Sequence, residues 1–379
     1  MMGANKVVIA AAGSGKTTFL VKQALGVNDG NVLIITYTES NEAEIRRKFF
    51  ELNGGVPKNV VVSTWFSFLI AHGIRPFQGG LFDFPVMGMT LVDKPSGLKF
   101  VNKGIPVRWG EEENFRRHYF DTKDKVYSDK LSKLVVRCDK HSDGSVIDRI
   151  SRIYAKVFID EVQDLAGYDL EIIRRLFESR SEVILVGDPR QVTYLTHNEQ
   201  KYTKYSEGGI REFLGAELPK KIKFEIDDKT LGVSHRNSAA ICGVSSRLYP
   251  KFAATIACDC AVCRPGIDLT PGLFIVRAAD KAKYLDQYRP VQLRYNVTSK
   301  GPDVRFPALN FGESKGLGFD HVIIFPTDDM AAWMKNNTTK LAPQTRAKMY
   351  VAMTRARHSV AVAFDFKDDE IMDGFALYE

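Results

Sequence analysis

The chain has 379 residues and a formal net charge of +7, from 53 Lys and Arg against 46 Asp and Glu. Hydrophobic residues make up 44% and charged residues 26%, which indicates a globular protein and excludes a disordered or collagen-like chain. No apolar run approaches the roughly 18 residues of a membrane span. The N-terminus leads into a glycine-rich loop and not a cleavage site, so we expect no signal peptide. Five cysteines in this length predict a reducing, cytoplasmic location without a disulfide framework.

Short apolar runs alternate with helical stretches along the first half of the chain. Strands are predicted over 6–11, 31–36, 59–63, 155–159 and 182–186, and helices over 16–25, 40–52 and 170–177. The second half repeats the pattern, with strands over 272–277, 291–295, 320–325 and 359–366 and helices over 280–288 and 343–353. Buried strands separated by helices are typical of parallel α/β sheets. We therefore expect two α/β lobes, with a boundary near the glycines of 208–215 and a ligand at the carboxyl ends of the strands or between the lobes.

Residues 69–156 interrupt this pattern and are too long for a simple loop, so we interpret them as an inserted subdomain. Between Lys94 and Lys156 there are 15 basic and 9 acidic residues, a net charge of +6. Aromatic residues are interleaved with the basic ones: Phe100, Trp109, Phe115, His118, Tyr119, Phe120 and Tyr127. Such a segment can be a solvated surface. It can also bind nucleic acid, because cations follow phosphates while rings stack on bases.

The sequence AAAGSGKT at 10–17 lies between a predicted strand and a predicted helix. This is the context of a phosphate loop, in which Gly13 and Gly15 let backbone N–H groups approach phosphate oxygens at a helix N-terminus. Lys16 then reaches the β- and γ-phosphates, and Thr17 can bind Mg²⁺.

A second predicted strand ends in two acidic residues, Asp160 and Glu161. A carboxylate in this position can hold Mg²⁺, directly or through water, and its neighbour can polarise the attacking water. We assign these roles to Asp160 and Glu161 respectively.

Eight segments in order resemble the motifs of superfamily 1 helicases of the UvrD/Rep/PcrA type. Besides the phosphate loop they are TYT at 36–38, STWFSF at 63–68, DEVQD at 160–164, GDPRQ at 187–191, SHRN at 234–237, GESKGLGFD at 312–320 and YVAMTRAR at 350–357. The resemblance implies two RecA-like P-loop NTPase lobes with parallel sheets, the first at 1–68 and 157–218 and the second at 219–379. The basic insertion at 69–156 then belongs to the first lobe and is expected to contact DNA.

The resemblance also implies roles for individual residues, with ATP and Mg²⁺ as cofactors. Gln191 is expected to sense the γ-phosphate, and Arg236 and Arg355 to act as arginine fingers. The residues expected to bind nucleotide are Gly13, Ser14, Gly15, Lys16, Thr17, Thr18, His235 and Gly316. Those expected to contact DNA are Tyr37, Thr38, Thr64, Trp65 and Tyr194.

Several positions depart from the family pattern. No Gln precedes the phosphate loop, where the family reads adenine, and His235 replaces the aromatic residue that stacks on the base. Thr196 stands in place of a strand-stacking Trp, and Gly318 in place of a Glu that touches nucleotide. Residues 238–311 leave little room for the large insertion of the second lobe, so a compact motor is expected.

The cysteines allow two interpretations. Cys258, Cys260 and Cys263 form a tight cluster, with Cys242 upstream, and thiolates at short spacing can hold Zn²⁺. Only one CxxC half-site is complete, however, so reduced cysteines in a loop are the simpler interpretation and no metal is predicted there.

The sequence therefore predicts an ATP-hydrolysing translocase or helicase on single-stranded DNA, with 3′→5′ polarity implied by the family and RNA left open. The alternative is a nucleic-acid-gated ATPase switch or sensor in a larger complex, for example beside a nuclease in a prokaryotic defence or phage system. A P-loop kinase or GTPase would not require Gln191, Arg236 and Arg355 in these contexts.

Overall fold

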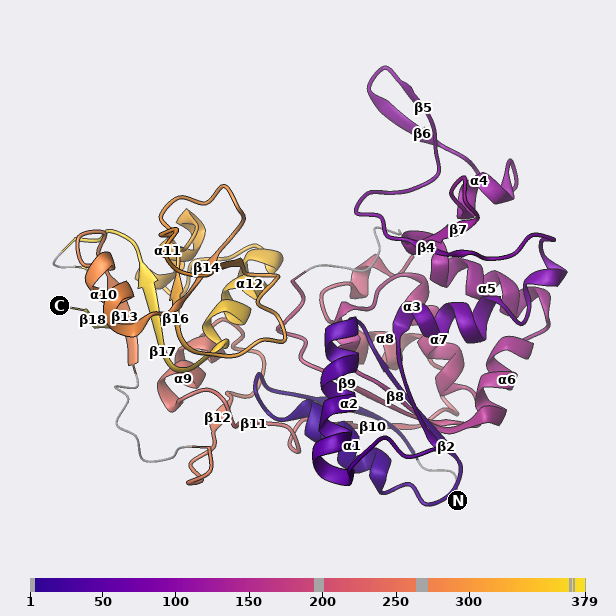
Figure 1. Cartoon of the computed structure of the whole chain (residues 1–379), viewed down its shortest axis with the longest axis horizontal. Coiled ribbons are helices and arrows are strands. Elements are labelled where there is room, and N and C mark those ends of the chain that lie inside the picture. The colour runs from indigo at the N-terminus through magenta and orange to yellow at the C-terminus, as the bar shows by residue number, and fades with distance from the viewer. Residues whose placement is uncertain (1–3, 194–200, 264–271, 368–369, 371, 379) are drawn as a thin grey trace. The chain divides into compact units, whose positions relative to one another are not determined.

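The computed structural model describes residues 4–193, 201–263, 272–367, 370 and 372–378 (Figure 1). The chain divides into two compact units. The first comprises Met1–Val8, Thr17–Gly187 and Leu195–Asp227, and the second Ile9–Lys16, Asp188–Tyr194 and Asp228–Glu379. No helix in the described part of the chain is both long and apolar enough to cross a membrane.

The first unit is built on a six-stranded sheet with the strand order β10-β1-β9-β8-β2-β3. The strands are β1 (Asn5–Ile9), β2 (Asn31–Thr36), β3 (Val60–Thr64), β8 (Tyr154–Ile159), β9 (Glu182–Gly187) and β10 (Phe224–Asp227). The pairings of β1 with β10, of β2 with β3 and β8, and of β8 with β9 are parallel. Runs of buried Val, Ile, Leu and Phe form the central strands β9, β8 and β2, as expected for a parallel sheet covered on both faces.

Helices surround this sheet. They are α1 (Lys16–Leu25), α2 (Glu39–Asn53), α3 (Trp65–Phe68), α5 (Leu131–His141), α6 (Ser145–Ile153), α7 (Tyr168–Phe177) and α8 (Ile210–Glu217). The glycine-rich stretch predicted as a boundary thus forms α8. Ile210, Phe213 and Leu214 recur there at helical spacing and are buried, and this apolar face outweighs the glycines around it.

The segment predicted as an insertion lies within the first unit. Its helices α5 and α6 pack on α7 and β8, so its C-terminal part completes the main fold. Its remaining elements are α4 (Phe115–Tyr119), the parallel pair β4 (Gly88–Thr90) and β7 (Lys125–Tyr127), and the antiparallel hairpin of β5 (Leu98–Asn102) and β6 (Ile105–Arg108). Figure 1 shows this hairpin projecting beyond β4, β7 and α4.

The second unit has its own six-stranded sheet, in the order β15-β14-β16-β17-β13-β18. The strands are β13 (Gly272–Val276), β14 (Val291–Arg294), β15 (Ala308–Asn310), β16 (Phe319–Ile324), β17 (Ala356–Ala363) and β18 (Ala376–Leu377), all paired in parallel. The helices are α9 (Ala239–Arg247), α10 (Lys281–Tyr288), α11 (Asp328–Lys335) and α12 (Pro343–Met353). A separate parallel pair joins β11 (Val233–Ser234) to β12 (Ile256–Ala257).

Alternation along the strands divides the core of the second unit into two layers. Val322, Ile324, Val360 and Val362 face the layer that contains Met330, Trp333 and Tyr350 of α11 and α12. Ile323 and Ala361 face the layer that contains Tyr284 and Leu285 of α10. A strand places successive side chains on opposite faces, so helices are needed on both sides of the sheet. The predicted α/β class with two parallel sheets is confirmed.

Candidate functional site

The candidate residues from the first half of the chain all follow strands of the first sheet. The phosphate loop follows β1, Tyr37 follows β2, Thr64 ends β3, Asp160 follows β8, and Asp188 follows β9. Parallel strands bring their carboxyl ends to the same edge of a sheet, which is where α/β proteins bind ligands. Each of these motifs therefore begins at or directly after the carboxyl end of a strand of the first sheet.

The phosphate loop has the backbone that its glycines predict. Gly13 has φ of 72° and Gly15 has φ of 82°, in the left-handed region that favours glycine. A Cβ atom added to Gly13 would lie 2.6 Å from the Cβ of Arg236 and 2.9 Å from the Oγ of Ser234. Gly13 is thus required both by its backbone conformation and by the close approach of residues 234–236.

The side chains of the loop suit an anion. Ser14 is 5% exposed, and its Oγ has no hydrogen-bond partner among the residues that the structure describes. A buried hydroxyl of this kind is costly unless a ligand pairs with it. Lys16, Thr17 and Thr18 form the first turn of α1, whose N-terminus favours phosphate.

Thr17 and the acidic pair belong to the first unit. The Oγ1 of Thr17 donates a hydrogen bond to Oε1 of Glu44 at 3.2 Å, which leaves the oxygen lone pairs of Thr17 for a cation. The backbone N–H of Asp160 donates to the carbonyl of Ile35 at 2.8 Å and extends the pairing of β8 with β2 to the end of the sheet. Asp160 is 6% exposed.

Glu161 has an unusual backbone. Its φ is 53°, in the left-handed region, which costs a non-glycine residue about 1 kcal/mol or more and is found often at functional sites. Its side chain is 8% exposed and accepts a hydrogen bond from Nε2 of Gln163. Gln163 thereby fixes the orientation of the carboxylate that we assign to the attacking water.

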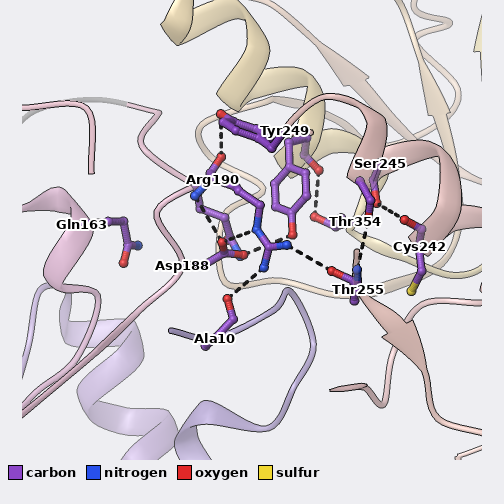
Figure 2. Close-up of polar contacts among 12 residues, drawn as sticks. Ala10, Gln163, Asp188, Arg190, Cys242, Ser245, Tyr249, Thr255 and Thr354 are labelled. Carbon is purple, nitrogen blue, oxygen red and sulfur yellow. Dashed lines mark hydrogen bonds and ion pairs between the residues drawn. The ribbon is translucent and has the colours of Figure 1, made fainter. Parts of the chain in front are cut away.

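A polar network surrounds Asp188 in the second unit, and Figure 2 shows part of it. Asp188 is fully buried and accepts hydrogen bonds from Arg190 Nε at 2.7 Å, from Gln191 Nε2 at 2.8 Å and from the Tyr350 hydroxyl at 3.2 Å. Arg190 also donates to the carbonyl of Ala10 at 3.0 Å. The network thus ties the start of the phosphate loop to residues 188–191 and to α12.

Charge and burial oppose each other in this network. Burial disfavours the charge of Arg190, but Asp188 and Tyr350 outweigh that effect and raise the pKa of Arg190. Burial also raises the pKa of Tyr350, so its hydroxyl remains a donor to Asp188. Arg190 and Asp188 form a buried ion pair at 2.7 Å whose atoms also make hydrogen bonds to Ala10, Gln191 and Tyr350, as a buried ion pair requires.

Arg355 connects this network to the predicted γ-phosphate sensor. Its Nη2 lies 3.2 Å from Oε1 of Gln191, while Nε and Nη1 donate to the carbonyls of Val351 and Leu317 at 3.1 and 3.2 Å. Arg355 is 2% exposed. Gln191 therefore uses both atoms of its amide, one toward Asp188 and the other toward Arg355.

Arg236 lies among the other motifs of the second unit. Its Nη1 donates to the carbonyl of Thr354 at 3.4 Å. A Cβ added to Gly318 would lie 3.2 Å from the Nε of Arg236. The Glu that the family has at this position would therefore be sterically crowded by Arg236. Gly316 has φ of 84°, which accounts for glycine in that turn.

The residues predicted to contact DNA have different environments. Tyr37 is half-buried, with its ring centroid 5.5 Å from that of Phe66. Thr38 and Thr64 cap α2 and α3. Tyr194 lies outside the described residues.

Trp65 corrects the sequence-based expectation. It is 1% exposed, and its Nε1 donates to Oδ1 of Asp169 at 2.8 Å. Trp65 is therefore a core residue whose ring cannot stack on a base in this conformation. Its neighbour Phe66 is half-buried and is therefore the more accessible aromatic side chain of residues 63–68.

The basic insertion is also less uniform than its composition predicts. His118, Tyr119 and Phe120 are buried, and Phe120 packs against Phe82 and Phe84, so part of the aromatic pattern forms a small core. Ion pairs to acidic residues involve several of the basic side chains, namely Lys99, Arg116, Lys133, Arg137, Arg152 and Lys156.

A hollow of about 480 Å³ opens within the insertion. Trp109, Tyr127, Arg116 and Arg117 contribute to its lining, and the guanidinium of Arg117 lies 5.5 Å from the Trp109 ring centre. Half-buried aromatic rings beside guanidinium groups are suited to bases and phosphates. This part of the insertion thus brings together the basic and aromatic side chains that alternate in the sequence.

Sequence reasoning gave no individual role to Asp188, Arg190 or Tyr350, although all three lie within the motifs. The sequence contained a usable pattern for the ion pair, because an Asp that directly follows a buried strand, with an Arg two residues later, predicts a buried ion pair. Sequence reasoning also missed the proximity of His235 to the cysteine cluster, since no spacing rule links residues 235 and 258–263.

One segment of the chain matches the model of a known family. Residues 100–197 match the family model of the UvrD/REP helicase N-terminal domain, a region that contains both the acidic pair and residues 188–191. The match spans 98 of the chain's 379 residues, and this segment therefore resembles the UvrD-like helicases, in agreement with the motifs.

Solved structures similar to this chain include that of Arterivirus nonstructural protein 10 (helicase), at 15% identity and a TM-score of 0.47. The same viral helicase in a complex with DNA gives 16% identity and a TM-score of 0.47. Both alignments cover 96% of this chain, which spans about 60% of the length of the viral protein. No curated protein sequence matches the chain.

Proposed function

We propose that this protein is an ATP-driven motor that moves along single-stranded nucleic acid. DNA is the expected track, and 3′→5′ is the polarity that the family implies. The observation that carries the proposal is the contact of Arg355 with Gln191 within the Asp188 network. A γ-phosphate that binds either side chain competes with this contact. Nucleotide binding would therefore rearrange residues 188–191 and Arg355.

The phosphate loop fits the triphosphate of ATP. Gly13 and Gly15 have the left-handed backbone that a phosphate loop requires, and Ser14 supplies a buried hydroxyl that such a ligand can pair with. Thr17 and Asp160 would hold Mg²⁺, which neutralises charge on the phosphates when it is bound. Lys16 would contact the β- and γ-phosphates.

Glu161 is proposed as the group that orients the attacking water and accepts its proton. Its carboxylate is buried, and Gln163 holds one of its oxygens, so little reorganisation is required. Arg236 and Arg355 are proposed to stabilise the charge that develops on the phosphate. Preorganised donors of this kind lower a barrier by about 3–4 kcal/mol each.

The track is proposed to contact the carboxyl ends of β2 and β3 and the exposed part of the insertion. Tyr37 and Phe66 offer rings at the first place, and Trp109 with Arg117 at the second. Exposed lysines that have no ion pair in the described part of the chain, Lys94, Lys103 and Lys123, extend the positive surface. Nucleic-acid affinity should therefore depend on salt.

Strand displacement by the purified full chain tests the motor function. Duplexes with a 3′ or a 5′ single-stranded tail are incubated with ATP, and Glu161→Gln is the matched inactive control. We expect displacement of the 3′-tailed duplex, abolished by Glu161→Gln. DNA-stimulated hydrolysis without displacement, restored by a partner protein, would instead support the ATPase switch, which the short 238–311 segment and Thr196 in place of Trp favour.

Charge reversal tests the nucleic-acid surface. In the variant Lys94→Glu, Lys103→Glu and Lys123→Glu, binding to a single-stranded oligonucleotide should weaken. The salt dependence should also flatten, by about 0.7 in log–log slope for each phosphate that the variant no longer neutralises. The control makes the same charge change at Lys220, Lys221 and Lys223, which are also exposed in the first unit. If the salt dependence of binding has the same slope in the two variants, the insertion does not contact the nucleic acid.

A further inference from the structure

Two short strands of the second unit bring a histidine and a cysteine together. β11 and β12 pair in parallel, with Val233 opposite Ile256 and Ser234 opposite Ala257. The ladder ends with the N–H of Cys258 donating to the carbonyl of Ser234 at 2.8 Å. Since the carboxyl ends of parallel strands meet at one edge, His235 and Cys258 emerge side by side despite their separation in sequence.

A tight turn at residues 260–263 then brings a second cysteine, Cys263, close to His235 and Cys258. The N–H of Cys263 donates to the carbonyl of Cys260 at 3.1 Å, and the Sγ of Cys263 lies 3.4 Å from Nδ1 of His235. The ligand atoms of His235, Cys258 and Cys263 all lie within 4.8 Å of one another. The thiol of Cys260 interacts with those of Cys263 and Cys258.

We propose that His235, Cys258 and Cys263 bind Zn²⁺, with Cys260 as the fourth ligand. Three thiolates and an imidazole are a donor set that zinc prefers. With Zn–S bonds of about 2.3 Å and Zn–N bonds of about 2.0 Å, ligand atoms in a tetrahedron lie roughly 3.5–3.8 Å apart. The ligand atoms of His235, Cys258 and Cys263 lie close to these separations. The exposed side chain of Cys260 must rotate toward them to complete the tetrahedron.

The imidazole favours a metal over a disulfide. A disulfide would use two sulfurs and leave His235 without a function in the cluster, whereas a metal can also be bound by Nδ1 of His235, which lies 3.4 Å from the Sγ of Cys263. Cys242, the residue that sequence spacing suggested as a partner, is buried and donates to the carbonyl of Asn237. The fold therefore places His235, and not Cys242, beside the cysteine cluster.

The site adjoins the phosphate loop. The N–H of His235 donates to the carbonyl of Gly13 at 2.9 Å, and Cδ2 of His235 lies 4.0 Å from the point where a Cβ on Gly15 would stand. Zinc would thus anchor residues 256–263 to the segment that holds the loop in place. In this role His235 is a positioning residue, and loss of zinc should weaken ATP binding.

Metal content tests the proposal independently of ATP hydrolysis. The full chain is purified without chelators, and zinc is measured by mass spectrometry for the parent, for Cys258→Ser and Cys263→Ser, and for Cys138→Ser. Cys138 is a buried cysteine of α5 in the first unit and serves as the matched control. We expect about one zinc per chain in the parent and the control and only a small fraction of that in the two cluster variants. Little zinc in the parent, or equal zinc in all four proteins, would overturn the proposal.

Cobalt substitution keeps the test decisive if the serine variants fail to fold. Co²⁺ added to the chelator-treated parent should give the intense thiolate-to-cobalt charge-transfer absorption of a sulfur-rich site, and Cys263→His, which retains a ligand, should still bind one metal. Absence of that absorption in the reduced parent would overturn the proposal. So would a disulfide within 258–263, detected by mass spectrometry, in protein purified without reductant.

Discussion

The replacement Gly13→Ala tests how closely residues 234–236 hold the phosphate loop. The new Cβ would lie 2.6 Å from the Cβ of Arg236, whereas carbon atoms pack at about 3.5–4.0 Å. The loop or Arg236 must therefore move by about 1 Å, and a misplacement of that size can cost about 10²-fold in rate. Left-handed strain at φ of 72° adds about 1–2 kcal/mol.

The control is Gly54→Ala, which separates strain from displacement. Gly54 has φ of 73° at the end of α2, and a Cβ there would meet nothing within 4 Å. Both variants should lose about the same stability in urea denaturation from strain. Only Gly13→Ala should lower kcat/KM for ATP hydrolysis, by about 10²-fold. Equal kcat/KM in the two variants would refute the idea that this close approach positions the loop.

Two further predictions concern the first unit. Trp65→Phe removes the hydrogen bond to buried Asp169 and should lower the free energy of unfolding by about 1–3 kcal/mol while leaving DNA affinity unchanged. Weaker DNA binding by a variant of unchanged stability would show instead that Trp65 contacts DNA. Burial raises the pKa of Glu171, but hydrogen bonds from Arg174 and its neighbours outweigh this and lower the pKa to about 2. Because the folded pKa lies below the unfolded one, Glu171 stabilises the fold above about pH 4.5, on the order of 3 kcal/mol, and this is lost as pH falls toward 2. The stability gap between the parent and Glu171→Gln should shrink over that range, and a gap independent of pH would contradict the assignment.

The sequence predicted the inner strands of both sheets because these strands appear as short apolar runs. The edge strands β10, β15 and β18 were not predicted, since they are short and more exposed. The strand at 31–36 and the helices at 16–25 and 343–353 have the predicted bounds. The last strand is displaced, since β17 begins at Ala356. Residues 356–358 lack the apolar run that predicts a strand, and Ala356 is held by pairing with Phe319 of β16.

The candidate site was predictable where chemistry depends on neighbouring residues in sequence. The phosphate loop and the pair of Asp160 and Glu161 are of this kind. Burial was not predictable from a motif, so Trp65 was assigned to DNA although the fold places it in the core. Proximity between distant segments was not predictable either, and the cluster of His235 with Cys263 depends on the pairing of two very short strands.

The most direct test of the proposed motor is ATP hydrolysis by the full chain, measured with and without a single-stranded DNA oligonucleotide. Lys16→Ala and Glu161→Gln are measured alongside as controls that remove the phosphate contact and the proposed base. The account predicts that DNA strongly stimulates hydrolysis in the parent and that neither variant hydrolyses ATP. Hydrolysis that is equally fast without DNA, or that persists in both variants, would contradict it.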